Sequence, residues 1–104
     1  MSTKITNNLA NRLVNAFLKN KLIKPIPNKY TKKMHSAEKF KNLCESKISK
    51  PIIGFKAGGT GIPLLKKLKE KEPFYARVYK HNFLTNNKSI KINKYTLGIE
   101  LEVC

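Results

Sequence analysis

The sequence predicts an α+β fold in which two N-terminal helices are followed by short, mixed β-strands. Three observations support this prediction. Apolar residues recur at helical spacing in residues 3–23 and 36–48, four of the five glycines lie close together just after them, and β-branched and aromatic residues are frequent from there on. Helices followed by strands along the chain are typical of the α+β class. We therefore divide the chain into a helical region, residues 1–50, and the start of a β-rich domain, residues 51–104.

Two amphipathic helices are expected in the first region. Residues 3–23 place apolar side chains on one stripe, at Ile5, Leu9, Leu13, Phe17 and Leu18. Pro25 and Pro27 follow, and proline is not tolerated in a helix interior, so the helix should end before them. Residues 36–48 repeat the helical pattern, with Cys44 as a small residue of the core.

Short strands are expected in the second region. The apolar stretch 51–56 leads into the glycine-rich turn, and "PLLKKLKEK" at 63–71 predicts a short helix with proline in its first turn. Strands are predicted at 73–80, 88–95 and 97–104, where residues alternate in polarity or are β-branched and aromatic.

Positive charge dominates the composition. The chain has 22 basic and six acidic residues, for a net charge of +16. Such a charge attracts polyanions, so a small lysine-rich nucleic-acid-binding protein is one functional hypothesis. Only two of the basic residues are arginines, although base and phosphate recognition favours the planar guanidinium group.

Composition also bears on location. The polar N-terminus lacks the apolar segment and cleavage site of a signal peptide, and no apolar run approaches the ~18 residues of a membrane span. The cysteines, Cys44 and Cys104, do not have metal-ligand spacing and are expected as free thiols. We therefore expect a cytoplasmic protein without a membrane partner.

Two of the few acidic residues, Glu100 and Glu102, lie in the last predicted strand. Alternate side chains of a strand share a face, so both carboxylates would project together while Leu101 faces the core. Converging carboxylate oxygens suit a hard divalent ion such as Mg²⁺ or Mn²⁺. An ordinary amphipathic strand with glutamates on its wet face would show the same pattern.

A lysine lies where the first apolar strand meets the glycines. Lys56 interrupts an otherwise apolar and glycine-rich stretch. A lysine held partly out of water can transfer a proton or pair with a substrate carboxylate, and amides of a glycine-rich turn can contact an anion. A structural turn followed by a solvated lysine is the alternative interpretation.

Together these features resemble the fumarylacetoacetate hydrolase superfamily, in particular its branch of 2-keto-4-pentenoate hydratases and 4-oxalocrotonate decarboxylases. Members carry a segment of the type V-G-Y-K-[IV]-G-[LG]-T, similar to residues 53–60 here, with Phe55 in place of tyrosine. Further along they carry an E-x-E strand, matched by residues 100–102. Gly61 departs from the pattern, because many members have serine there.

The resemblance implies a divalent metal, Mg²⁺ or Mn²⁺, held by three carboxylates, two of them from Glu100 and Glu102. The third ligand would lie further along the chain, so we expect this sequence to be the front portion of a family member. Such a portion would be inactive alone and would depend on homo-oligomer formation or on a complementing chain.

The resemblance also implies a substrate class: small 2-oxo or 2-hydroxy-dienoic acids of aromatic catabolism, such as 2-hydroxypenta-2,4-dienoate. Lys56 would pair with the substrate carboxylate or transfer a proton. The amides of Gly58, Gly59 and Thr60 would contact the anionic end of the substrate. Hydration, decarboxylation and carbon–carbon hydrolysis all remain open as the reaction.

Overall fold

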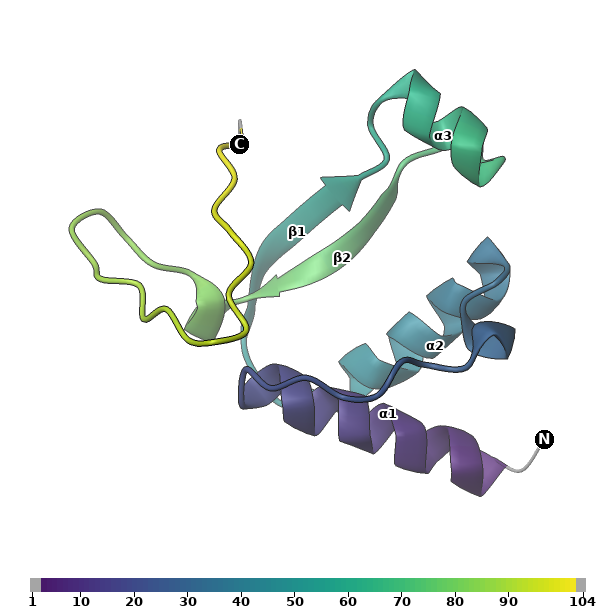
Figure 1. Cartoon of the computed structure of the whole chain (residues 1–104), viewed down its shortest axis with the longest axis horizontal. Coiled ribbons are helices and arrows are strands. Elements are labelled where there is room, and N and C mark those ends of the chain that lie inside the picture. The colour runs from purple at the N-terminus through teal and green to yellow at the C-terminus, as the bar shows by residue number, and fades with distance from the viewer. Residues whose placement is uncertain (1–2, 103–104) are drawn as a thin grey trace.

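The computed structural model describes residues 3–102 and confirms an α+β chain (Figure 1). The helices are α1 (Thr3–Leu18), α2 (Met34–Ser46) and α3 (Ile62–Leu68), and the strands are β1 (Ile52–Gly58) and β2 (Phe74–Tyr79). Two 3₁₀ turns, Asn28–Tyr30 and Lys80–Asn82, complete the regular structure of this part of the chain.

The core lies between α1 and α2, which run side by side in Figure 1. Their apolar stripes meet as the spacing predicts, and the buried residues of this cluster are Ala10, Val14, Tyr30, Phe40 and Cys44. The prediction that Cys44 is a small core residue is confirmed. Fully burying a side chain such as Val or Phe stabilises the fold by roughly 1.5–3 kcal/mol, so this cluster is a main source of stability.

Helix α1 ends at Leu18, five residues earlier than predicted. Asn20 adopts a left-handed conformation with φ of 50°. The N–H of Lys21 then donates to the carbonyl of Ala16 at 2.8 Å, and the N–H of Asn20 donates to the carbonyl of Phe17 at 3.3 Å. These two bonds form a Schellman motif, which asparagine at this position tolerates. The helix therefore stops locally, before the prolines are reached.

The two strands form an antiparallel pair with α3 in their connection. The register pairs Phe55 with Arg77 and Lys56 with Ala76. Residues directly opposite share a face and successive residues alternate between faces. Lys56 and Arg77 therefore project from opposite faces of the sheet.

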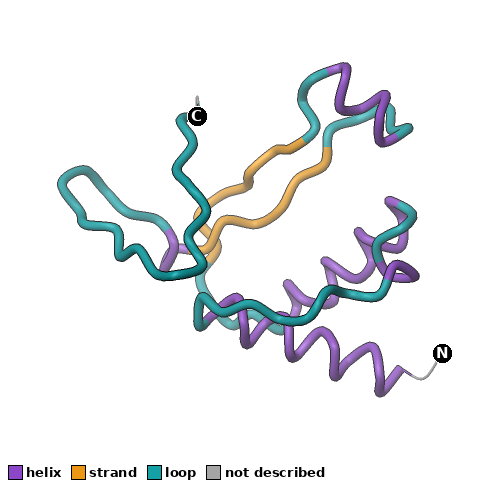
Figure 2. The backbone as a smooth tube through the Cα atoms, in the orientation of Figure 1, coloured by secondary structure: helices purple, strands orange, loops and turns teal. Residues whose placement is uncertain are grey.

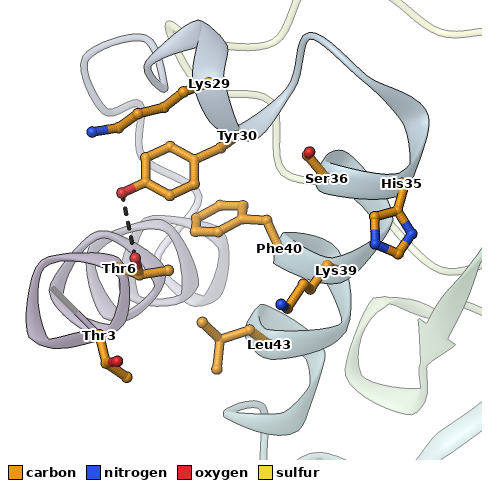
Figure 3. Close-up of a pocket in the computed structure, with 9 residues that line it drawn as sticks. All are labelled: Thr3, Thr6, Lys29, Tyr30, His35, Ser36, Lys39, Phe40 and Leu43. Carbon is orange, nitrogen blue, oxygen red and sulfur yellow. Dashed lines mark hydrogen bonds between the residues drawn. The ribbon is translucent and has the colours of Figure 1, made fainter. Parts of the chain in front are cut away.

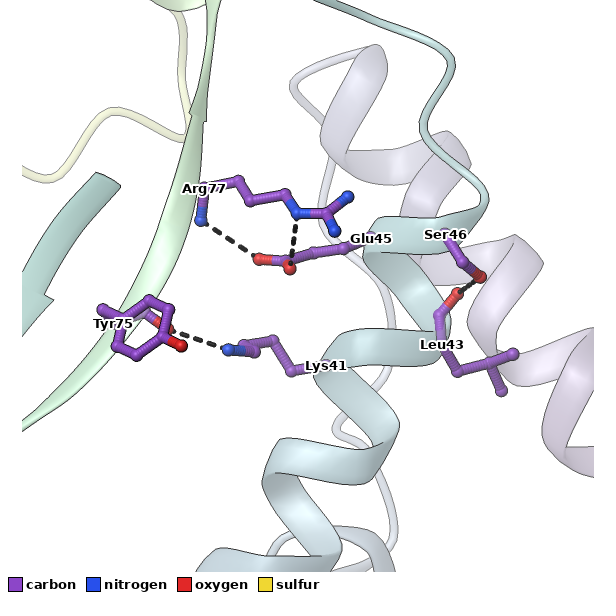
Figure 4. A network of polar contacts seen from close by, with 6 residues as sticks. All are labelled: Lys41, Leu43, Glu45, Ser46, Tyr75 and Arg77. Carbon is purple, nitrogen blue, oxygen red and sulfur yellow. Dashed lines mark hydrogen bonds and ion pairs between the residues drawn. The ribbon is translucent and has the colours of Figure 1, made fainter. Parts of the chain in front are cut away.

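Polar contacts join the Arg77 face to α2 (Figure 4). The carboxylate of Glu45 accepts the backbone N–H of Arg77 at 3.1 Å and lies 3.3 Å from its Nε. Lys41 Nζ donates to the carbonyl of Tyr75 at 2.8 Å. The Glu45 side chain is only 12% exposed, so this ion pair is screened less than a pair on the open surface.

Aromatic rings join the end of β2 to α1. Tyr79 is buried and meets the ring of Phe17 edge-on, with centroids 6.0 Å apart. The ring of His81 lies 6.1 Å from both. The sheet is thus attached to the helical region on one face and at one end, and the Lys56 face stays open.

The prediction of strands at 88–95 and 97–104 is wrong for the described residues, because residues 83–102 form neither helix nor strand (Figure 2). Residues 103–104 lie outside the described residues. Asn93 interrupts the first pattern: its Oδ1 accepts the N–H of Tyr95 at 2.8 Å, and its own N–H donates to the hydroxyl of Thr96 at 3.1 Å. Such a local turn competes with strand pairing for the backbone groups.

Among residues 3–102, no helix combines the length and the apolar character needed to cross a bilayer.

Candidate functional site

The loop that follows β2 returns to the sheet and brings Glu102 onto Lys56 (Figure 1). Lys56 Nζ lies 2.7 Å from each carboxylate oxygen of Glu102, although 46 positions separate the two residues. The side chains are 59% and 49% exposed. An ion pair this accessible adds little stability, and a metal ion or a substrate can reach either partner.

Two hollows share this ion pair. One lies along the returning loop and is lined by Lys56, Leu97, Gly98, Ile99, Glu100 and Glu102. The other lies along the sheet and is lined by Ile53, Gly54, Phe55, Lys56, Ala57, Thr60, Val78, Phe83 and Glu102. Both hollows lie around Lys56, and the apolar residues among their lining give the candidate site an apolar wall beside its charged centre.

The structure brings four of the six predicted site residues together at these hollows: Lys56, Thr60, Glu100 and Glu102. Gly58 and Gly59 line neither hollow. A Cβ at these two positions would lie 2.6 Å and 2.8 Å from atoms of the Phe74 ring, so close packing against β2 accounts for both glycines. Their contact with a substrate stays a prediction.

The metal site is limited by the number of donors. The carboxylates of Glu100 and Glu102 have the oxygen chemistry that Mg²⁺ and Mn²⁺ prefer. Within residues 3–102, however, there is no group of three or more His, Cys, Asp or Glu side chains that could hold a metal ion. The ammonium group of Lys56 also neutralises Glu102, so a metal ion at that carboxylate would compete with the lysine.

Phe83 is a site residue that sequence patterns did not predict. It contributes to the wall of the hollow along the sheet. Phe83 comes directly after the 3₁₀ turn Lys80–Asn82, which follows β2. The residues of this turn do not form a recognisable sequence pattern, because the turn's position is set by where β2 ends.

Comparisons of the chain with protein-family models, with curated proteins and with solved structures found no match. The interpretation of this site therefore depends on the contact between Lys56 and Glu102 and on the residues around it.

Proposed function

We propose that this chain carries part of the active site of a divalent-metal-dependent hydratase or decarboxylase of small 2-oxo or 2-hydroxy-dienoic acids, such as 2-hydroxypenta-2,4-dienoate. The observation that supports it best is the contact of Lys56 with Glu102, with Glu100 lining the same hollow. The two carboxylates carry the charge that a metal ion requires, and the lysine carries the charge that an anionic substrate requires. The lysine and the glutamates come from two segments far apart in the sequence.

In this proposal, Glu100 and Glu102 hold Mg²⁺ or Mn²⁺ through carboxylate oxygens. Two protein ligands leave a hard divalent ion with several positions for water and substrate oxygens, so binding to this chain alone is weak. A further carboxylate from a second chain would strengthen it. When bound, the metal supplies Lewis-acid stabilisation of negative charge on the substrate.

Lys56 has the second role, as the cation that would meet an anionic substrate. Without ligand it is neutralised by Glu102. A substrate carboxylate in the hollow would replace Glu102 as the partner of Lys56, which frees the glutamate for the cation. From the same position the ammonium group could donate a proton to the substrate.

The net charge of +16 favours the same substrate class. Small 2-oxo and 2-hydroxy-dienoic acids are anions at neutral pH, and a strongly positive protein raises their local concentration and their rate of association. The effect falls as salt screens the field.

Titration with Mn²⁺ tests the proposal. The free Mn²⁺ signal in electron paramagnetic resonance gives the affinity of the wild-type chain and of Glu100→Gln, Glu102→Gln and Lys56→Met. We expect each glutamine substitution to weaken binding about tenfold, equivalent to about 1.4 kcal/mol. Lys56→Met should instead strengthen binding, because it removes the ammonium group that competes for Glu102.

Glu72→Gln is the matched control, since Glu72 is an exposed glutamate between α3 and β2 and lines neither hollow. Mn²⁺ affinity that is unchanged in both glutamine variants, or reduced equally by Glu72→Gln, would refute the ligand role. Loss of 2-hydroxypenta-2,4-dienoate, followed by ultraviolet absorbance with Mg²⁺ present, is expected to be slow or absent with this chain alone.

Binding of nucleic acid is the second candidate. Phe55 and Tyr75 are 65% and 59% exposed on the sheet, their rings meet edge-on at 5.7 Å, and Lys41 lies 5.2 Å from the Tyr75 ring centroid. Exposed rings beside cations can stack bases. The Mn²⁺ titration separates the two proposals, because this alternative requires neither Glu100 nor Glu102.

A further inference from the structure

A separate cavity lies in the helical region, between α1, the 3₁₀ turn Asn28–Tyr30 and α2 (Figure 3). Its volume is about 520 Å³, which falls in the range of pockets that hold small molecules. Its lining residues are Thr3, Thr6, Lys29, Tyr30, His35, Ser36, Lys39, Phe40 and Leu43. None of them belongs to the hollows around Lys56, so this cavity is independent of the proposed metal site.

One wall of the cavity is apolar and well ordered by packing. Tyr30 and Phe40 are buried, with exposed fractions of 9% and 6%, and their rings lie 5.2 Å apart at a tilt of 39°. Leu43 lies one turn along α2 from Phe40, and Figure 3 shows it on the same side. The exposed edges of these two rings and the half-buried Leu43 together form a wall that a flat apolar body about the size of one ring can contact.

The rest of the lining is basic or hydroxylated. Lys29, His35 and Lys39 contribute nitrogen donors, and none of the lining residues within 3–102 is acidic. Lys29 Nζ lies 5.3 Å from the centroid of the Tyr30 ring, which places a positive charge at the aromatic wall. The hydroxyls of Thr6 and Tyr30 lie 3.4 Å apart, within reach of the same ligand.

The start of α2 adds to this positive character. His35 and Ser36 belong to its first turn, and the residue that precedes the helix, Lys33, makes no side-chain capping bond. The first amides of the helix therefore receive no capping bond from the Lys33 side chain, and they add positive partial charge beside the two basic side chains.

We propose that this cavity is a binding site for a small aromatic anion, a monocyclic carboxylate or phosphate ester. The ring would pack on Tyr30 and Phe40, and the anionic group would meet Lys39, His35 and the start of α2. An uncharged ring would lose the ionic contacts, and inorganic phosphate would lose the apolar ones. Both parts of the ligand are therefore needed for binding.

Nuclear magnetic resonance titration of the ¹⁵N-labelled chain tests this site. The probes are benzoate, phenyl phosphate, benzyl alcohol and inorganic phosphate. We expect saturable shifts of the Thr6, Tyr30, Ser36 and Phe40 amides with phenyl phosphate or benzoate at concentrations below about 10 mM, where binding free energies are a few kcal/mol. Binding of both aromatic anions indicates a site for either acid, and binding of phenyl phosphate alone indicates a phosphate ester.

Two exposed lysines provide the matched variants. Lys39→Gln removes a lining charge and should weaken the aromatic anions about tenfold, whereas Lys32→Gln removes the same charge from the adjoining loop and should change affinity by less than about twofold. Glu102→Gln should have no effect, so failure here is distinguishable from failure of the metal site.

The proposal is overturned if no probe saturates, if inorganic phosphate or benzyl alcohol shifts these amides as strongly as the aromatic anions, or if the two lysine variants behave alike.

Discussion

At the scale of single residues, Cys44 and Tyr79 are two weak acids whose ionisation the fold opposes. Burial raises the pKa of the Cys44 thiol above its ordinary value of 9.0, an effect to which Glu45 adds and which Lys47 reduces. Burial likewise raises the pKa of the Tyr79 hydroxyl above 10.0, with Glu45 again adding to the effect. Both groups are therefore neutral in the folded chain at pH values where the unfolded chain begins to ionise.

This difference makes stability depend on alkaline pH. A raised pKa in the folded state contributes stability that is fully present below the unfolded pKa and is lost as pH rises through the folded one. We expect the free energy of unfolding of the wild-type chain to begin to fall near pH 8, as the thiol of the unfolded chain ionises, and to fall further near pH 10, as its tyrosine ionises. The slope is at most about 1.4 kcal/mol per pH unit for each group. Urea denaturation at a series of pH values measures this decline in the free energy of unfolding.

Cys44→Ala isolates the thiol. The variant lowers stability at all pH values because it trims the core, but it should have a shallower decline between pH 8 and 9.5 than the wild type. Equal slopes for the two chains would show that the buried thiol does not contribute. The comparison of slopes cancels the titration of the many lysines, which both chains share.

Burial of Cys44 follows from helical periodicity and is confirmed, because local pattern decides it. The family resemblance implied that Lys56 and Glu102 belong to one site. The structure brings the two side chains into contact, and their roles stay a prediction. The direct ion pair was not foreseen, nor was the cavity beside Tyr30 and Phe40. Both depend on how distant segments meet, which spacing along the chain does not encode.

At the scale of elements, the turn between β1 and α3 is held by a glycine that no other residue replaces easily. Gly59 is buried and has a φ of 66°, in the left-handed region that side chains disfavour. A Cβ there would lie 2.8 Å from the Phe74 ring. The turn thus couples the end of β1 to the start of β2.

Gly59→Ala should lower the free energy of unfolding by about 2 kcal/mol, from backbone strain together with the contact at Phe74. Gly98→Ala is the control, since nothing lies within 4 Å of its Cβ position, and it should change stability by less than about 0.5 kcal/mol. Thermal or urea unfolding followed by circular dichroism gives both values. Similar losses in the two variants would contradict this account of the turn.

The predicted helices and the first two predicted strands form, whereas the last two predicted strands do not. All three helices and the strands β1 and β2 were predicted within a few residues, because helical periodicity is local and the two strands pair with each other. The patterns at 88–95 and 97–104 also alternate, but a strand forms only when a neighbour pairs with it. Without a pairing strand, the apolar side chains of these segments stay exposed to solvent in the described residues.

At the scale of the whole molecule, the chain is open for its size. Its accessible surface is 9296 Å², against roughly 5,900 Å² for a folded monomer of its mass. Its radius of gyration is 15.3 Å, against about 13 Å for a compact domain of this length. Much of the excess is apolar and lies in residues 83–101: Phe83, Leu84, Ile90, Ile92, Leu97, Ile99 and Leu101 are all exposed.

Exposed apolar surface and positive charge act against each other in self-association. Burial of apolar area favours contact between copies, and stable interfaces bury about 1,200–2,000 Å² in total. The charge of +16 on each copy opposes it through a repulsion that salt screens. We therefore expect a monomer at low salt and concentration-dependent oligomers as salt is raised.

Sedimentation velocity at about 50 mM and 500 mM NaCl, spanning the screening range, measures this balance. Leu97→Ser combined with Leu101→Ser should abolish the oligomers, because both side chains are wholly exposed in the segment that would be covered. Leu22→Ser removes an equally apolar side chain, 72% exposed, from outside that segment and should leave association unchanged. If the chain is monomeric at both salt concentrations, or if Leu22→Ser acts like the double variant, residues 83–101 do not mediate contact between copies, and a complementing chain becomes the candidate to cover them.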